Sequence, residues 1–317
     1  MSFDFTKISF ITPCFNEEKN IENLIASIHS AMGDEPHEII IVDNGSTDSS
    51  LSLARSAGAK AYIAPHATIG ALRNLGVQHA EGDLLVFLDA DVTLSPDWLD
   101  QLRSASNNWP KTSLIITGSK VESPPDASYL ETVWFSNLKR TKNTYINSAH
   151  CITTKCAFKK VFGFSETLHS GEDHDFCQRA IKQDIKVFND PSIQAFHHNY
   201  PKTLTQFAKR EIWHGSEDFQ SFRHFITSRT ANAAIVNSLF FVLLVVALLF
   251  GSSIAYIAVL AIFTLSLCFI FMKLDGPYHL IHLPAQLVVI QVYLFSRTLA
   301  LWHPQCLPDN KTATPET

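Results

Sequence analysis

Short apolar runs alternate with amphipathic segments through the first half of the chain. Four runs have the length and composition of buried strands and lie at residues 8–12, 38–42, 59–63 and 83–88. Between them, apolar residues recur at helical spacing over 21–28, and a further helix is expected at about 69–80. Strands that alternate with helices are typical of a mostly parallel sheet wrapped by helices. The sequence therefore predicts an α/β, Rossmann-like domain.

The last third of the chain has a different pattern, because residues 233–272 contain no Asp, Glu, Lys or Arg. Two apolar stretches, 233–250 and 254–272, approach the roughly 20 residues that a helix needs to cross a bilayer. A Gly-Ser-Ser turn separates them, so we expect a transmembrane helical hairpin; a buried pair of soluble helices is the alternative. A third apolar stretch, 280–302, either crosses or lies in the interface, because it contains polar residues and a proline: Pro284, Gln286, Gln291 and Arg297.

These patterns divide the chain into an α/β domain over 1–225, a membrane region over 226–303 and a polar tail over 304–317. Cations flank the hairpin on both sides: Lys209, Arg210, Arg223, Arg229 and Lys273. The positive-inside rule places both ends of the hairpin on the cytoplasmic side. The N-terminus lacks a basic stretch followed by a long apolar run that would export the first domain. We therefore expect an integral protein of the cytoplasmic membrane whose α/β domain faces the cytoplasm.

Composition narrows the choice of partners. The 317 residues include 25 Lys and Arg against 30 Asp and Glu, a net charge of −5. Nucleic-acid binding needs a basic surplus that this chain lacks, so no nucleic-acid partner is expected. The six cysteines form no CxxC pair, which indicates reduced thiols in a cytoplasmic compartment and argues against a zinc site.

Polar residues follow the predicted strands, at the sheet edge where ligands of open α/β sheets bind. Pro13 and Glu17 follow the first strand, and Asp43 ends the second. Asp89 and Asp91 follow the fourth; on an extended backbone, residues two apart point to the same side, so both carboxylates could face one cation. Mg²⁺ or Mn²⁺ bound by carboxylates and diphosphate oxygens is the usual arrangement for nucleotide substrates. Two solvated Asp residues in a strand-end turn are the alternative.

Four segments carry a family resemblance in their order and spacing: ITPCFNEEKNI, IIIVDNGSTDSS, GALRNLGVQHAEGDLLVFLDADV and GFSETLHSGEDHDFCQRA. Together they resemble the motifs of family 2 glycosyltransferases over about residues 8–215. The resemblance implies a GT-A fold and inverting transfer of a sugar from a nucleotide-sugar donor. It makes 1–225 the catalytic domain, and implies a saccharide or lipid-linked acceptor and work in cell-envelope polysaccharide or glycolipid synthesis.

The resemblance also implies roles by position. Pro13, Glu17 and Asp43 would surround the base and ribose, and Arg73 would lie near the diphosphate. Asp91, with Asp89, would hold the metal, and Asp173 would be the general base.

Physical arguments support some of these roles separately. Asp43 can accept a hydrogen bond from a pyrimidine imide N–H, although a helix-capping Asp would look similar. Arg73 lies early in a helix, where its charge favours a diphosphate; a solvated arginine is the alternative. Asp173 opens a segment that looks helical over 176–181, where an acidic cluster also favours the helix dipole. His197 and His198 follow an apparent strand over 185–196. One of them could supply a further metal contact; the alternative is that either is a surface or packed residue.

Two features of the sequence limit the assignment. Asn44 stands where the strand-two motif often has a second carboxylate, so metal binding is not assigned to that loop. Polyprenyl-phosphate sugar synthases usually carry a DADLQHP-like run, whereas this chain reads DADVTLSP. A polyprenyl-phosphate sugar synthase is therefore the second candidate. A catalytically silent nucleotide-sugar-binding membrane module is the third; the presence of Asp89, Asp91 and Asp173 together argues against it.

Overall fold

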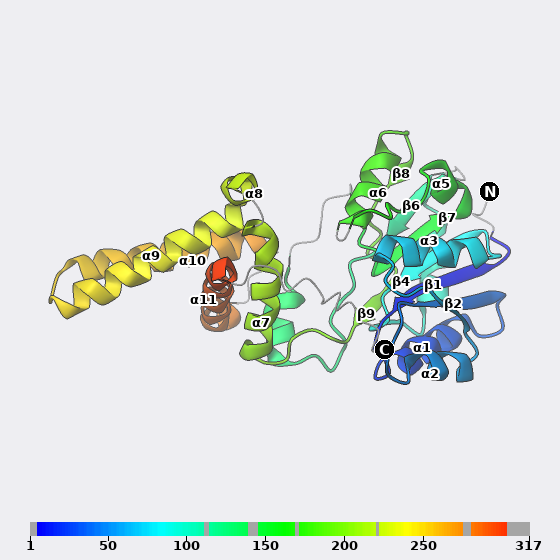
Figure 1. Ribbon diagram of the computed structural model, residues 1–317, viewed down its shortest axis with the longest axis horizontal. Helices are drawn as coiled ribbons and strands as arrows, with labels where there is room; N and C mark the ends of the chain where they lie inside the picture. The colour runs from blue at the N-terminus through cyan, green and yellow to red at the C-terminus, as the bar shows by residue number, and fades with distance from the viewer. Residues whose placement is uncertain are drawn as a thin grey trace, which may run out of the picture. The chain divides into compact units, whose positions relative to one another are not determined.

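The computed structural model describes residues 5–110, 114–138, 145–168, 171–219, 222–274 and 280–302. The chain packs as two compact units (Figure 1). The first combines Met1–Pro124 with Arg140–Asn199, and the second combines Pro125–Lys139 with Tyr200–Thr317. Residues 200–225, which the sequence placed in the α/β domain, thus group with the apolar helices, and the functional boundaries stay a prediction. The predicted polar tail lies outside the described residues.

The first unit is built on a seven-stranded sheet in the order β3-β2-β1-β4-β7-β6-β8. The first four strands of the chain pair in parallel and confirm the four predicted strands. Strand β7 runs antiparallel between β4 and β6, and β8 is parallel to β6. The sheet is therefore mostly parallel, as predicted. The strands are β1 (Ile8–Cys14), β2 (His37–Asp43), β3 (Lys60–Ile63), β4 (Leu84–Leu88), β6 (Ile115–Gly118), β7 (His150–Thr154) and β8 (Lys186–Val187).

Helices cover both faces of this sheet, which explains why the residues of β1 and β4 are buried on both faces and mostly apolar. Alternate residues of one strand face opposite sides: Val86 belongs to the core under α1 and α4, and Phe87 to the core under α3, α5 and α6. Figure 1 shows α3 on one face and α1 and α2 on the other. The helices are α1 (Ile21–Met32), α2 (Ser50–Ser56), α3 (Ile69–His79), α4 (Trp98–Ser106), α5 (Lys155–Lys160) and α6 (Glu172–Ile181).

The strand predicted over 185–196 is wrong. The structure has two short strands there, β8 and β9 (Ala195–His197), separated by a turn. Asp190 Oδ1 accepts a hydrogen bond from Ser192 N at 3.2 Å, and Pro191 between them has no N–H to donate to a ladder. Strand β9 instead pairs antiparallel with β5 (Val92–Leu94), which places His197 opposite Val92.

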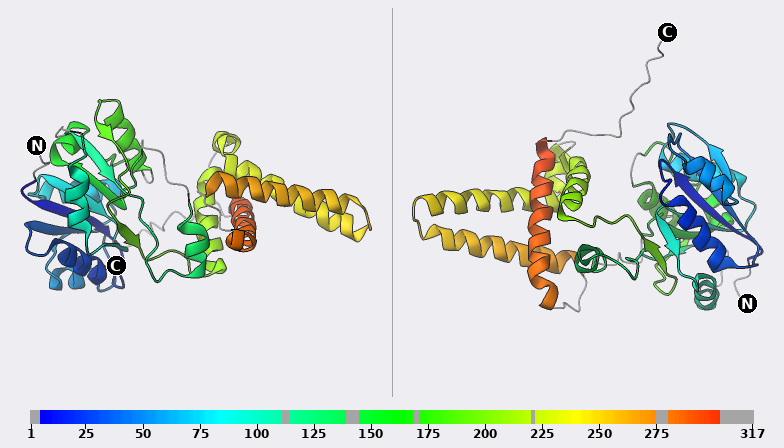
Figure 2. Two further views of the ribbon diagram at one scale, coloured as in Figure 1. Left: turned by 180° about the vertical axis from the view of Figure 1, so that it is seen from behind. Right: turned by 90° about the horizontal axis from the view of Figure 1, so that it is seen from below.

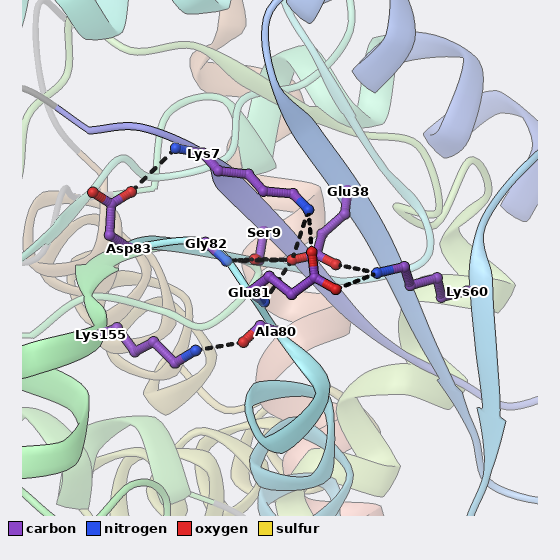
Figure 3. Close-up of polar contacts among 9 residues, drawn as sticks. All are labelled: Lys7, Ser9, Glu38, Lys60, Ala80, Glu81, Gly82, Asp83 and Lys155. Carbon is purple, nitrogen blue, oxygen red and sulfur yellow. Dashed lines mark hydrogen bonds and ion pairs between the residues drawn. The ribbon is translucent and has the colours of Figure 1, made fainter.

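A polar network ties the amino ends of the sheet strands together, at the edge opposite the candidate site (Figure 3). The buried Glu38 Oε1 accepts hydrogen bonds from Ser9 Oγ and Glu81 N, both at 2.7 Å. Its Oε2 pairs with Lys60 Nζ at 2.7 Å. Because these residues come from or precede β1, β2, β3 and β4, one carboxylate fixes how four parallel strands begin.

The second unit is helical. The predicted hairpin is present as α9 and α10, two antiparallel helices side by side, and α11 crosses them instead of running alongside (Figure 2). By length and composition, three helices of the described residues could cross a membrane: Arg229–Leu249, Ile254–Lys273 and Leu283–Trp302. That they do so stays a prediction. The helices of this unit are α7 (Leu204–Gly215), α8 (Phe222–Thr227), α9 (Arg229–Leu249), α10 (Ile254–Lys273) and α11 (Leu283–Leu299).

Polar side chains join the three apolar helices. Asn237 Nδ2 of α9 donates to Gln291 Oε1 of α11 at 3.0 Å, and Gln291 Nε2 donates to Ser266 Oγ of α10 at 2.6 Å. Asn237 lies eight residues from the start of α9 and Ser266 seven from the end of α10. At 1.5 Å per residue, α11 crosses about 12 Å from the end of the hairpin that carries Arg229 and Lys273.

Candidate active site

The loops that follow β1 and β2 are joined by hydrogen bonds. Asn16, with φ of 56°, donates its N–H to Ser46 Oγ at 2.9 Å and accepts from Thr47 N at 2.8 Å through Oδ1. Glu17 N donates to Ser50 Oγ at 2.7 Å. Asn residues tolerate this left-handed backbone better than most, so Asn16 is a positioning residue that the sequence analysis missed. The bonds hold Glu17 and Asp43 at the same sheet edge.

Asp43 ends β2 with one carboxylate oxygen engaged and the other without a partner. Oδ1 accepts from Gly45 N and Ser46 N, both at 2.8 Å. Oδ2 is buried and has no hydrogen-bond partner among the described residues. Asp43 is not the cap of the next helix, because α2 begins at Ser50. A buried carboxylate oxygen without a donor is costly, so this oxygen suits a donor that a ligand brings.

The other residues predicted around the base lie close to this edge. Pro13 is buried in β1 opposite Val42. Burial raises the pKa of Glu17, a hydrogen bond from Asn20 lowers it, and the charges of Asp91 and Asp89 raise it further. Glu17 therefore faces the same acidic region as the aspartates that follow β4.

Asn44 stands where the family motif often has a carboxylate. Its Oδ1 accepts a hydrogen bond from the backbone N–H of Ala67 at 3.0 Å.

Arg73 is buried, with 1% of its side chain exposed, and bridges two carboxylates. Its Nη2 lies 2.8 Å from Asp89 Oδ1 and its Nη1 lies 2.7 Å from Glu172 Oε1. The solvated helix arginine that was the alternative is therefore wrong. Contact with a diphosphate stays a prediction; Arg73 Nε has no hydrogen-bond partner among the described residues. The structure itself gives Arg73 the role of joining the turn after β4 to the start of α6.

Asp89 and Asp91 lie in a turn, closed by a hydrogen bond from Val92 N to Asp89 O at 3.1 Å. The expectation of an extended backbone here was wrong, because the chain reverses between β4 and β5. Their side chains have different partners: Asp89 pairs with Arg73, and Asp91 Oδ2 lies 3.4 Å from His197 Nε2. Burial, and next the charge of Asp89, raise the pKa of Asp91 to about 6.

The structure also distinguishes the two histidines. His197 faces Asp91, whereas His198 Nε2 bonds to Thr93 Oγ1 at 2.7 Å. Among the described residues, no group of three His, Cys, Asp or Glu side chains is placed to hold a metal ion. Asp91 and His197 are nevertheless an oxygen and a nitrogen ligand of the kind that Mn²⁺ accepts, next to a second carboxylate, Asp89. The donor set fits a divalent cation whose further ligands come from substrate or solvent.

Asp173 lies in the first turn of α6, which follows Gly171 with φ of 74°. Tyr145 OH donates to its Oδ2 at 2.8 Å, Ser148 N donates to the same oxygen at 3.3 Å, and His174 N donates to Oδ1 at 2.7 Å. Burial and the charge of Asp173 raise the pKa of Tyr145, which keeps its hydroxyl protonated as a donor. These donors fix the orientation of the carboxylate.

The two carboxylates nearest Asp173 in the sequence form ion pairs with arginines. Glu172 pairs with the buried Arg73, and Asp175 pairs with Arg179 Nε at 2.8 Å one turn along the helix. Of the three acidic residues that open α6, Asp173 alone has no arginine or lysine partner within the described part of the chain. Tyr145 was missed by sequence reasoning, because 28 residues separate it from Asp173 and no motif marks it.

Comparison with known families shows which family the chain belongs to. The family model described as "Glycosyl transferase family 2" matches residues 9–163, which include the loops after β1, β2 and β4. The chain belongs to glycosyltransferase family 2. Asp173 lies beyond the matched residues, so its place in this family 2 site rests on the geometry above.

Known relatives are similar over part of their length. The pre-mycofactocin glycosyltransferase of Mycobacterium tuberculosis is 25% identical over 232 residues, which cover 68% of this chain and 48% of the relative. The dolichol-phosphate mannosyltransferase of Pyrococcus furiosus is 28% identical over 127 residues, which cover 38% of this chain and 36% of the relative. The chain thus spans about half or less of the length of these family 2 relatives.

A solved structure extends the similarity to the fold. The mannosyltransferase PcManGT from Pyrobaculum calidifontis, in complex with GDP-Man and Mn²⁺, superposes with a TM-score of 0.57 at 17% identity. The match covers 94% of this chain and 88% of PcManGT. At this identity the likeness speaks for the fold, and it confirms the predicted GT-A fold of this family 2 protein.

Proposed function

We propose that this protein is an inverting glycosyltransferase that moves a sugar from a nucleotide-sugar donor to a saccharide or lipid-linked acceptor at the membrane. The observation that carries the proposal is the geometry of Asp173. Its carboxylate is held by Tyr145 and Ser148 and joined through the neighbouring Glu172 to Arg73 and Asp89. A base and the turn that faces the donor are thereby built on one connected framework.

The reaction needs one proton transfer and one displacement. An acceptor hydroxyl oxygen attacks the anomeric carbon of the donor sugar, and Asp173 takes the hydroxyl proton as the new bond forms. The bond from the anomeric carbon to the diphosphate oxygen breaks, and the nucleoside diphosphate leaves with the electron pair. Attack from the side opposite the leaving group inverts the anomeric carbon.

The donor would lie along the loops after β1, β2 and β4. Asp43 Oδ2 would accept the imide N–H of the base, with Glu17 and Pro13 beside the nucleoside. Asp91, Asp89 and His197 would hold Mn²⁺ or Mg²⁺, which when bound neutralises the charge that develops on the leaving diphosphate. The GDP-Man and Mn²⁺ of the similarly folded PcManGT support this choice of ligands.

The hairpin of α9 and α10 would anchor the enzyme in the cytoplasmic membrane. Because α11 crosses the hairpin, both cannot run along the bilayer normal (Figure 2). We therefore assign α11 to the interface, with the exposed Trp302 just after it at headgroup level. Arg229 and Lys273 at the polar end of the hairpin favour a cytoplasmic catalytic unit.

A polyprenyl-phosphate sugar synthase is the second candidate, and the similarity to a dolichol-phosphate mannosyltransferase favours it. In that reaction a lipid phosphate oxygen is the nucleophile. A phosphate oxygen is already deprotonated at neutral pH, so transfer would then depend little on Asp173.

Donor titration of the full-length chain in detergent tests the proposal. UDP- and GDP-sugars are added with Mn²⁺ or with EDTA, and thermal stabilisation and release of nucleoside diphosphate are measured. A true donor raises stability as RT ln(1 + [L]/Kd), and we expect release only with metal and acceptor present. Full activity in EDTA would contradict the metal assignment. Donor binding without turnover, over a panel of saccharide and lipid-phosphate acceptors, would favour the silent module.

A further inference from the structure

A groove lies at the polar end of the α9–α10 hairpin. Helix α9 begins at Arg229 and α10 ends at Lys273, so the two cations lie at the same end of the antiparallel pair. An isolated bridge between Leu138 and Leu274 brings a distant segment of the same unit beside the end of α10. The groove has a volume of about 450 Å³ and is lined by Leu138, Arg229, Thr230, Phe269, Met272 and Lys273.

The charged side chains that line this groove, among the described residues, are both cations. Within the same part of the chain, no carboxylate lines the groove and no ion pair joins Arg229 or Lys273 to an acidic side chain. Arg229 is exposed, and Lys273 Nζ lies 4.9 Å from the centre of the Tyr293 ring. A cation–π contact positions an ammonium without neutralising it. Two positive charges thus share one hollow that an anion would fill favourably.

Apart from Thr230, the rest of the lining is apolar. Phe269 is buried at the base of the groove, while Met272 is half exposed at its edge. Further along α9, the exposed Val236 lies seven residues, about two helical turns, from Arg229 and on the same face of the helix, so apolar surface continues from the groove along the hairpin. The hollow therefore suits a molecule that carries a phosphate at one end and a hydrocarbon chain at the other.

We propose that this groove binds the phosphate of an anionic bilayer phospholipid, between Arg229 and Lys273, with an acyl chain beside Phe269 and Met272. Thr230 supplies a hydroxyl that can donate to a phosphate oxygen. Basic pockets between membrane helices on the cytoplasmic side bind anionic headgroups in this manner. A zwitterionic lipid has the same phosphate but an added cation, which the two side chains would repel. The site rests on the proposed membrane insertion of α9 and α10, and it is separate from the candidate active site.

Native mass spectrometry of the full-length chain in detergent tests this site. Phosphatidylglycerol and phosphatidylcholine with identical acyl chains are titrated separately, and lipid adducts are counted. We expect one saturable phosphatidylglycerol adduct that forms in preference to phosphatidylcholine. Each basic residue near a membrane surface raises the affinity for an anionic lipid about fivefold. The R229Q variant should therefore bind phosphatidylglycerol about fivefold more weakly than the wild type. K273Q should act similarly, but it also removes the contact with Tyr293; R229Q is therefore the primary variant.

Lys209 provides the matched control, because it is an exposed cation of the same unit that does not line the groove. K209Q should leave the adduct within about twofold of the wild type. Equal binding of both lipids by the wild type, or equal losses in R229Q and K209Q, would overturn the proposal. Preferential binding of undecaprenyl phosphate over phosphatidylglycerol would also overturn it, by assigning the groove to an isoprenoid phosphate. None of these readings involves sugar transfer, so they do not depend on the catalytic proposal.

Discussion

Arg73 Nη2 lies 2.8 Å from Asp89 Oδ1, and this pair places a buried cation directly behind the acidic turn that follows β4. The second Nη of the same guanidinium holds Glu172, which is 99 residues away in the sequence. The turn of Asp89 and Asp91 and the helix that carries Asp173 are thereby fixed to one side chain. Arg73 therefore sets the spacing between the acidic turn and the start of the helix that carries Asp173.

Replacing Arg73 should destabilise the protein and stop transfer. R73Q would leave Asp89 and Glu172 without their cation, and breaking a buried ion pair typically costs about 3–5 kcal/mol. The thermal unfolding midpoint of the full chain in detergent measures this. The control is R103Q, which breaks an ion pair with Glu35 whose two side chains are 48% and 45% exposed, and should cost below about 1 kcal/mol. Equal midpoints for the two variants would contradict the role given to Arg73.

Replacing Asp173 with Asn should impair chemistry and spare donor binding. The variant keeps the size of the side chain but cannot take a proton, and general-base removal typically costs about 10²–10⁴ in rate. Transfer rates at saturating acceptor and donor Kd by calorimetry provide the two readouts. D175N, on the same turn but paired with Arg179, is the matched control and should retain most activity. Near-normal turnover of D173N would move the base elsewhere or point to a phosphate acceptor.

Replacing Asp43 with Asn should impair donor binding and spare chemistry, the reverse of the effect expected for D173N. A neutral amide would lose the charge-assisted hydrogen bond that Asp43 Oδ2 would accept from the base, which is worth about 1.5–3 kcal/mol. Donor Kd should rise about 10- to 100-fold, with a small change in turnover at saturating donor. D34N, in an exposed turn after α1, serves as the control. Unchanged donor affinity in D43N would refute the base contact.

The network around Glu38 predicts a pH-dependent stability (Figure 3). Burial favours a raised pKa for Glu38, but hydrogen bonds from Lys60, Ser9 and Glu81 outweigh it and lower the pKa from 4.5 to about 2. The ionised Glu38 thereby adds about 3 kcal/mol to the free energy of unfolding. This contribution is complete above pH 4.5 and is lost as the pH falls through about 2. The difference in thermal midpoint between wild type and E38Q should be largest near pH 7 and shrink below pH 4.5. E35Q, at a surface ion pair, should show little difference at any pH.

Membrane depth should distinguish α11 from the hairpin. Spin labels at Val288 and Leu299, both about half exposed on α11, are 11 residues and about 16 Å apart along the helix. If α11 lies in the interface, collision with oxygen and with a polar relaxation agent should report the same depth for both. Labels at Leu239 and Leu248 of α9, about 14 Å apart, should differ in depth by most of that length. A similar depth difference in α11 would make it a third span.

The sequence by itself determined the elements, because periodicity is a local property. Short, mostly apolar runs marked β1 to β4, and the apolar stretches from 233 to 272 marked the hairpin. It also determined the edge of the sheet where Asp43 and Asp89 lie, since parallel strands share their carboxyl ends. The prediction of one strand over 185–196 was wrong for the same local reason. Its apolar content suggested a single strand, but the turn at Asp190 divides the segment in two.

Only the tertiary structure decided which partner each polar side chain has. Arg73 meets Glu172 across 99 residues and Tyr145 meets Asp173 across 28, and no spacing rule predicts such pairs. The pairing of β5 with β9 placed the His197 ring 3.4 Å from the Asp91 carboxylate, while His198 donates its backbone N–H to the Asp91 carbonyl oxygen at 2.9 Å. Packing likewise set the direction of α11, whose composition fits a span or an interfacial helix equally well. Propensity and hydropathy act over a few residues, whereas these choices depend on which surfaces the folded chain brings together.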